Sequence, residues 1–292
     1  MELPNDPKRG PPTTPSGDRT PSPAARRSGK LPPGSADPEL GVPDCALTRK
    51  LTAQTSLSAG ELESLNGLLA EARTVPVNRE IITEGYKYTA LFVLLEGAAM
   101  RYRVLHDGRR QVMNIILPGD FAGFPACFFE RALYSITALT DTAVAAIPFA
   151  RLYRLFEEQP RLAAAMFWLF SCETAMYAER LIDIGRRSAI ERVAHFLLEL
   201  LTRFQIIGLA DDRSFRMPLT QELIGDVLGL TSVHVSRTLR QLRADGLILV
   251  QDHQVTITDV DALSALADFE RSYLRHLRMN EALLPKPPGG PR

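Results

Sequence analysis

The spacing of apolar and polar residues along this chain is of two kinds, and it changes from one to the other near Phe149. Residues 47–72 have a helical pattern. From Val75 to Ile147, short β-prone runs such as ALFVLLEGAAMRYRVL and HDGRRQVMNIILPGD are separated by glycines. Asp107-Gly108, between two such runs, favours a hairpin because both residues tolerate positive φ. Many short strands at this spacing predict a sandwich or small barrel.

After Phe149 the apolar period becomes helical. Gln159-Pro160 opens a segment without Gly or Pro that continues to Gly185. An apolar residue recurs every seven positions in it, at Ala163, Phe170, Tyr177 and Ile184, with Met166, Phe167, Thr174 and Leu181 beside them. Such a stripe needs a partner surface, either the β domain alone or, as the better fit, the same helix of a second subunit. We therefore expect a homodimer built on residues 162–184.

A second helix is expected to begin at Ser188. Ile190, Val193, Ala194, Leu197 and Leu201 would share its apolar face. The junction Gly185–Ser188 is then a candidate hinge.

The next pattern is typical of a helix-turn-helix. Residues 220–242 read TQELIGDVLGLTSVHVSRTLRQL. Two short helices that cross steeply need a small residue at the contact, here Gly225, and a glycine at the turn, here Gly229. Thr231 is expected to cap the second helix. The inward side chains are predicted to be Leu223, Ile224, Val227, Val235, Leu239 and Leu242.

The outward face of the second helix is basic and polar. It would present Ser232, Val233, Ser236, Arg237 and Arg240, side chains that can reach base edges and phosphates in a major groove. The following RADGLILVQDHQVTI contains two β-prone runs around a polar tip at residues 252–254, which predicts a wing. A plain helical hairpin with a β-ribbon is the structural alternative.

Composition changes this picture little. Residues 1–45 hold eleven of the 21 prolines and are expected to be a disordered tail, with a second flexible tail at 283–292. Between Ser188 and Glu281 there are ten Arg and Lys against thirteen Asp and Glu, but residues 232–243 contain three arginines and no acid. The net charge of −3 over residues 188–281 counts mildly against DNA binding, because attraction to phosphates supplies much of the affinity, but the local basic pattern matters more.

Several classes of function find no support in the sequence. Three scattered cysteines, Cys45, Cys127 and Cys172, give no disulfide framework and no zinc spacing. No nucleophile–base pair, phosphate loop or metal cluster is recognisable, so we expect no enzyme, no cofactor and no metal. No apolar run is long enough to span a bilayer and no secretory signal is present, so the expected location is the cytoplasm.

Taken together, the order of these motifs resembles the Crp/Fnr (catabolite activator and fumarate–nitrate regulator) family over roughly residues 50–258. The resemblance rests on LPGDFAGF in the β region, the long helix after a proline, the helix-turn-helix and DGLI. It implies an α+β fold with a cyclic-nucleotide-binding-like β-roll (double-stranded β-helix), a long dimerisation helix and a C-terminal winged helix-turn-helix. The implied boundaries are 46–157 for the β-roll domain, 158–187 for the helix and hinge, and 188–282 for the DNA-binding domain.

The resemblance also implies roles for particular residues. Ser232, Val233, Ser236 and Arg237 fall where the family reads bases, and Thr220 where it touches phosphate. Phe124 replaces the family's ribose-binding Glu and Tyr134-Ser135 its phosphate-binding Arg-Ser, so cyclic AMP is not the expected effector. The oxygen-sensing branch uses an N-terminal cysteine cluster, of which only Cys45 is present here. His106 beside the expected turn is interpreted as an exposed loop residue rather than a haem ligand.

The sequence thus predicts a dimeric, sequence-specific DNA-binding transcriptional regulator. Its partners would be a palindromic operator, a second copy of itself, RNA polymerase and an effector of unknown identity. An effector would bind in the β-roll, with an aromatic pocket predicted at Phe121, Gly123, Phe124, Phe128, Tyr134, Ser135 and Tyr177. The alternative is a ligand-binding module that regulates a protein partner without binding DNA; the exposed Arg237 and Arg240 argue against it.

Overall fold

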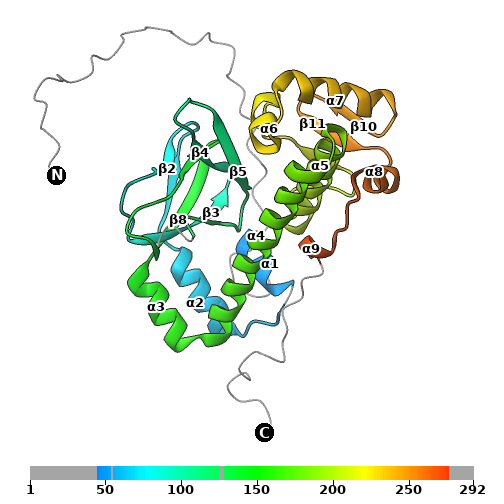
Figure 1. Cartoon of the computed structure of the whole chain (residues 1–292). Coiled ribbons are helices and arrows are strands. Elements are labelled where there is room, and N and C mark those ends of the chain that lie inside the picture. Colours follow the sequence, from blue (N-terminus) through cyan, green and yellow to red (C-terminus); the bar gives the residue numbers. More distant parts are fainter. Residues whose placement is uncertain (1–44, 54, 125–127, 276–292) are drawn as a thin grey trace, which may run out of the picture.

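The computed structural model describes residues 45–53, 55–124 and 128–275 of the 292-residue chain. Cys127 and both predicted tails, apart from Cys45, lie outside the described residues. Figure 1 shows a β-roll, a long helix that runs diagonally beside it, and a smaller C-terminal module at the far end of that helix. None of the helices in the described part is long and apolar enough to cross a membrane.

The β-roll consists of two four-stranded antiparallel sheets, with the strand orders β1-β8-β3-β6 and β2-β7-β4-β5. A core of aliphatic side chains, among them Ile82, Leu94, Ile116, Ile136 and Val144, is buried in it. The strands are β1 (Ala72–Val75), β2 (Glu80–Ile82), β3 (Ala90–Glu96), β4 (Ala99–Val104), β5 (Arg110–Ile116), β6 (Phe121–Ala122), β7 (Ser135–Ala138) and β8 (Thr142–Pro148). The expected sandwich is confirmed.

The predicted hairpin at Asp107-Gly108 is also confirmed, since it joins β4 to β5. Gly108 has a φ of 85°, a conformation that costs glycine little, and His106 is exposed in the same turn. The region with a helical pattern, residues 47–72, contains two helices, α1 (Ala46–Thr52) and α2 (Ala59–Leu69). Ser58 starts α2 with a capping box, in which it exchanges hydrogen bonds with Glu61.

Three helices follow the roll: α3 (Phe149–Glu158), α4 (Pro160–Arg186) and α5 (Ala189–Ile206). Pro160 stands in the first turn of α4, where its missing N–H costs nothing. As predicted, Ser188 caps α5, through a capping box with Glu191. The chain leaves helical geometry only at Arg187 and Ser188, so α4 and α5 are joined by a very short link.

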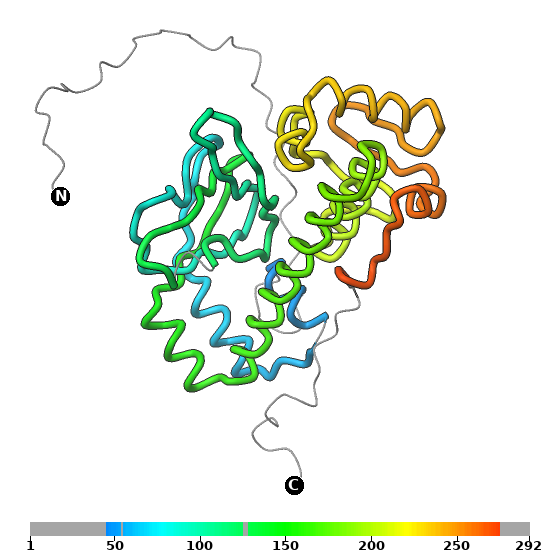
Figure 2. The backbone as a smooth tube through the Cα atoms, in the orientation of Figure 1, coloured from blue at the N-terminus to red at the C-terminus, as the bar shows by residue number. Residues whose placement is uncertain are grey.

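The C-terminal module surrounds α5 with short elements. They are β9 (Ser214–Arg216), α6 (Gln221–Leu228), α7 (Ser232–Ala244), β10 (Ile248–Gln251), β11 (Gln254–Ile257), α8 (Val260–Ala267) and α9 (Ser272–Arg275). One continuous core joins α5 to the module, including Phe196, Leu200, Phe204, Val235 and Leu263. In the tube view the module lies at the end of α4, beside the β5 side of the roll (Figure 2).

Candidate nucleic-acid interface and effector pocket

The turn between α6 and α7 follows from two glycines. Gly229 caps α6 in the left-handed conformation, with a φ of 66°. A Cβ on Gly225 would lie 2.4 Å from the carbonyl oxygen of Leu230, so only glycine permits the close crossing. The hydroxyls of Thr220 and Thr231 accept hydrogen bonds from the backbone N–H of Leu223 and His234, and thereby cap α6 and α7. The predicted roles of both glycines and of Thr231 are confirmed.

The two helices share a buried apolar core. Ile224, Val227, Val235 and Leu242 are buried, while Leu223 and Leu239 are half-buried against the same cluster. This is the inward set that the sequence pattern predicted. It fixes the rotation of α7 about its axis, because a rotated helix would place Arg237 or Arg240 in the core.

The opposite face of α7 is open to solvent. Ser232, Val233, Arg237 and Arg240 are exposed and Ser236 is half-buried. Val233 is 62% exposed, so its methyl groups are accessible on this face. Arg237 has no hydrogen-bond or ion-pair partner among the described residues. Thr220 is exposed at the start of α6, so the structure brings the predicted DNA-contacting residues onto accessible surface.

The predicted wing is present as the β10–β11 hairpin. Asp252 and His253 both have positive φ, as a two-residue type I′ turn requires. Sequence reasoning missed β9, which pairs with β11 and extends the wing to three strands. The signal was only the short alternation Ser214-Phe215-Arg216, in which Phe215 alone is buried.

The aromatic residues of the predicted effector pocket lie together in the β-roll and against α4. Phe124 stacks on Phe170 with ring centroids 3.5 Å apart, and Phe121 and Phe128 lie 4.8 Å from Phe170 and 5.4 Å from Phe124, respectively. The Tyr134 hydroxyl donates to the carbonyl oxygen of Phe124 at 2.7 Å. The rings therefore pack against one another and occupy much of the space that the predicted pocket would have offered.

The remaining predicted pocket residues have separate structural partners. The Ser135 hydroxyl accepts from the backbone N–H of Glu84. Gly123 has a φ of 102°, and a Cβ there would meet the side chain of Ile82 at 2.7 Å. Tyr177 lies on α4. Its hydroxyl accepts a hydrogen bond from a buried cation that was not predicted from the sequence.

That cation is Arg101 of β4, which is 1% exposed. Its guanidinium donates to the carboxylate of Glu173 and the hydroxyl of Tyr177, and it lies 4.7 Å from the centre of the Tyr134 ring. Burial alone would lower the pKa of Arg101, but Glu173 and Tyr177 outweigh it and the pKa is raised. The sequence signal was an arginine inside the apolar run AAMRYRV and a Glu that interrupts the apolar stripe of α4.

These contacts correct the interpretation of α4. Phe170 is 8% exposed and packs on the β-roll, and Tyr177 bonds to Arg101, so neither lies on a free seam. The open apolar face is the adjacent one, with Phe167 69% and Leu181 74% exposed and Thr174 and Ala178 between them. Ile184, at the end of the predicted stripe, is 40% exposed.

Comparison with known proteins agrees with this architecture. The family description "Cyclic nucleotide-binding domain" matches residues 72–159, and "Crp-like helix-turn-helix domain" matches residues 191–266. The transcriptional activator protein Anr of Pseudomonas aeruginosa is 29% identical over 230 residues, which cover 79% of this chain and 93% of Anr. The fumarate and nitrate reduction regulatory protein of Escherichia coli K12 is 28% identical over 229 residues, covering 78% of this chain and 91% of that protein.

Solved structures give the same result. FixK2 from Bradyrhizobium japonicum superposes with a TM-score of 0.60 at 28% identity, over 67% of this chain and 96% of FixK2. The two family matches on this chain cover the β-roll and then the helix-turn-helix with its wing. The chain belongs to the Crp/Fnr family and is a DNA-binding transcriptional regulator with an effector-binding-type β-roll, not an enzyme.

Proposed function

We propose that this regulator binds a two-fold symmetric operator as a homodimer and reads each half-site with α7. The observation that carries the proposal is the exposed polar face of α7, held rigidly by the buried opposite face. Ser232, Val233, Ser236 and Arg237 would contact base edges. Arg240 and Thr220 would contact phosphates, as suits a cation and a hydroxyl at a helix N-terminus.

The dimer would form through the exposed face of α4. Phe167, Thr174 and Leu181 recur every seven residues, the repeat that keeps one helix face against a parallel partner. Phe167 and Leu181 are 69% and 74% exposed on this face, and a second α4 would remove their apolar surface from water. Two α7 helices of such a dimer must match successive major grooves, about 34 Å apart.

Control by a signal is expected to enter through the β-roll and to act by moving α5 and the module relative to α4. Of the predicted hinge Gly185–Ser188, Gly185 and Arg186 lie within α4, so the movement would occur at Arg187 and Ser188. We propose that cyclic AMP is not that signal. Phe124 and Tyr134 stand where a ribose and a cyclic phosphate would need a carboxylate and a guanidinium, and the buried cation beside Tyr134, Arg101, is already paired with Glu173. An apolar or aromatic effector, or none, suits this pocket better.

Selection of bound sequences from a random DNA pool tests the proposal directly. The expected result is an inverted repeat with half-sites one helical turn apart, bound by two copies of the chain. Non-symmetric or sequence-independent enrichment would contradict it. Addition of cyclic AMP is expected to leave the affinity for the selected site unchanged.

Because its target is chromosomal DNA, the protein would act in the cytoplasm, with RNA polymerase as the expected partner at promoters.

A further inference from the structure

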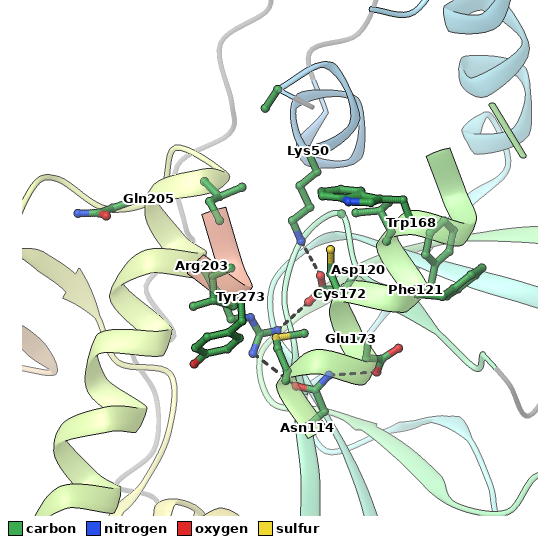
Figure 3. A pocket seen from close by; sticks show the side chains of 17 residues that line it. Lys50, Asn114, Asp120, Phe121, Trp168, Cys172, Glu173, Arg203, Gln205 and Tyr273 are labelled. Carbon is green, nitrogen blue, oxygen red and sulfur yellow. Dashed lines mark hydrogen bonds and ion pairs between the residues drawn. The ribbon is translucent and has the colours of Figure 1, made fainter. Parts of the chain in front are cut away.

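A cavity lies beside the aromatic group of the roll, next to Lys50. It has a volume of about 480 Å³, is partly open to solvent, and is lined by residues of α1, β5, the turn before β6, α4, α5 and α9. Figure 3 shows its lining, with Lys50 entering from α1, Trp168 and Cys172 from α4, and Arg203 from α5. Phe121 and Phe170, which belong to the aromatic group of the roll, also line this cavity. The volume is in the range of sites that hold small organic ligands.

One side of the cavity is a buried ion-pair group. The Lys50 ammonium donates to one oxygen of Asp120 at 2.5 Å, and Arg203 donates to the other at 2.9 Å. The Lys50 side chain is only 12% exposed, and burial lowers its pKa despite Asp120. An ammonium has three N–H donors, and Asp120 is its one hydrogen-bond acceptor among the described residues. The other two donors therefore need acceptors that the described chain does not supply.

The carboxylates beside the cavity are already neutralised. Asp120 is shared by Lys50 and Arg203, and Glu173 accepts from Arg101 and from Asn114. An incoming anion would thus meet a free donor on Lys50 rather than an unpaired negative charge.

The other side of the cavity is aromatic and apolar. The rings of Trp168 and Tyr273 line it together with the side chains of Leu169 and Met176. Burial raises the pKa of the Cys172 thiol to about 11, so at neutral pH this group faces the cavity uncharged. Flat apolar groups pack well on such rings, whereas a fully hydrated ion would leave the ring faces without apolar contacts.

We propose that this cavity binds a small aromatic carboxylate, with the carboxylate on the Lys50 ammonium and the ring against Trp168. The Lys50 donors set the preference for a carboxylate over a neutral group of the same shape. The aromatic walls set the preference for a ring over an aliphatic acid.

The position of this site gives binding a route to the DNA-binding module. Asp120 bonds to Arg203, Arg203 contacts Glu199 at 3.3 Å, and Glu199 accepts from Arg180 at 2.9 Å. Arg180 and Arg187 then share Asp183, each at 2.9 Å, and Arg187 is the C-cap of α4. A ligand carboxylate on Lys50 would share the ammonium with Asp120 and would thereby alter this chain of ion pairs at its first link. This part of the inference rests on the proposed function, whereas binding itself does not.

Intrinsic fluorescence is a direct probe of the cavity, because Trp168 is the only tryptophan in the chain. Benzoate, phenylacetate and 4-phenylbutyrate would be titrated against benzamide and benzyl alcohol as neutral analogues. We expect a saturable change in Trp168 emission with the carboxylates and at least tenfold weaker binding of the neutral compounds. Calorimetry would give the same dissociation constants independently.

Three variants locate the site. Lys50→Met is expected to remove the preference for carboxylates, and Lys87→Met is the matched control, since Lys87 forms an exposed pair with Glu130. Tyr134→Phe alters the aromatic pocket and is expected to leave binding unchanged. No saturable signal in the wild type, or unchanged carboxylate binding in Lys50→Met, would overturn the inference. Loss of binding in Tyr134→Phe would assign the ligand to the other pocket and overturn it as well.

Operator binding by the same preparations separates this inference from the proposed function. Wild-type protein that binds its selected operator but gives no saturable Trp168 signal would contradict only the cavity proposal. Saturable carboxylate binding without any selected operator would contradict only the proposed mode of DNA recognition.

Discussion

At the scale of single residues, Arg237 is the strongest candidate for a base contact. Its side chain is exposed on α7, while Val235, two positions earlier, is fully buried. A guanidinium can bind guanine O6 and N7 together, which is worth about 1–3 kcal/mol of discrimination. Arg237→Ala is therefore expected to abolish preference for the selected operator, measured by fluorescence anisotropy at constant salt. Arg154→Ala, an exposed arginine on α3, is the control; equal affinities of Arg237→Ala and wild type would show that another residue reads the base.

Val233 sets a second expectation about specificity. A carboxylate at this position can accept from cytosine N4, whereas the methyl groups of valine suit a thymine methyl. Val233→Glu is expected to shift the sequence selected from a random pool toward cytosine at the contacted position. Because Val233 is 62% exposed, the substitution should leave stability unchanged within about 0.5 kcal/mol. An unaltered selected site would mean that Val233 lies away from the bases.

His195 makes stability depend on pH. It is fully buried on α5 between the rings of Phe269 and Tyr273, and burial lowers its pKa to about 3, with Arg187 and Arg180 adding to the effect. Below its ordinary pKa of 6.5 the unfolded chain takes up a proton that the folded histidine does not, so stability falls as pH falls from 6.5 toward 3. At pH 5 this loss is about 2 kcal/mol.

The comparison that isolates this effect uses His195→Phe. Burial raises the pKa of Asp183, whose carboxylate lies 3.5 Å from the His195 ring, to about 6, which stabilises the fold as pH falls and opposes the effect of His195. Urea unfolding at pH 7 and pH 5 should show that the free energy of unfolding decreases less for His195→Phe than for wild type. His106→Phe, in an exposed turn, should behave like wild type. Equal pH dependence of His195→Phe and wild type would be the contrary result.

At the scale of elements, the two apolar faces of α4 have different partners. Phe167→Glu with Leu181→Glu would place charges in the proposed dimer seam, at a cost of several kcal/mol. The expected result is a folded monomer by light scattering. Tyr153→Glu with Leu133→Glu, two exposed apolar positions outside α4, is the matched control and should stay dimeric. A dimeric Phe167/Leu181 variant would place the seam elsewhere.

At the scale of the whole molecule, a polar contact joins the roll to the DNA-binding module. Arg110 of β5 donates twice to Asp226 of α6, at 2.6 and 2.8 Å, and the Gln111 amide donates to the carbonyl oxygen of Asp226 at 2.9 Å. Both charged side chains are about one quarter exposed, so the pair is only partly screened. The contact limits how far the module can rotate about Arg187 and Ser188.

Loss of this contact is expected to weaken operator binding. Arg110→Ala should reduce affinity roughly fivefold, about 1 kcal/mol, because a looser module holds two α7 helices less well in register. The reversed pair Arg110→Asp with Asp226→Arg should recover most of that loss. Arg109→Ala, which breaks only an exposed pair with Asp107, is the control. If the charge-reversed variant bound the operator as weakly as Arg110→Ala does, the ion pair would have no part in holding the module against the roll.

The sequence by itself determined the helix-turn-helix and the wing. Gly225, Gly229, Thr231 and the 252–253 turn act through neighbours a few residues away, and such local geometry is written in residue type and spacing. Only the tertiary structure decided which face of α4 is free. Phe170 and Phe167 both belong to seven-residue apolar repeats, so periodicity alone could not choose between them. The choice depends on Arg101, 72 residues before Glu173, and on the Phe121 and Phe124 rings. The cavity beside Lys50 depends in the same way on residues that are far apart in the sequence, from Lys50 to Tyr273. These residues meet only when α1, α4, α5 and α9 have packed together.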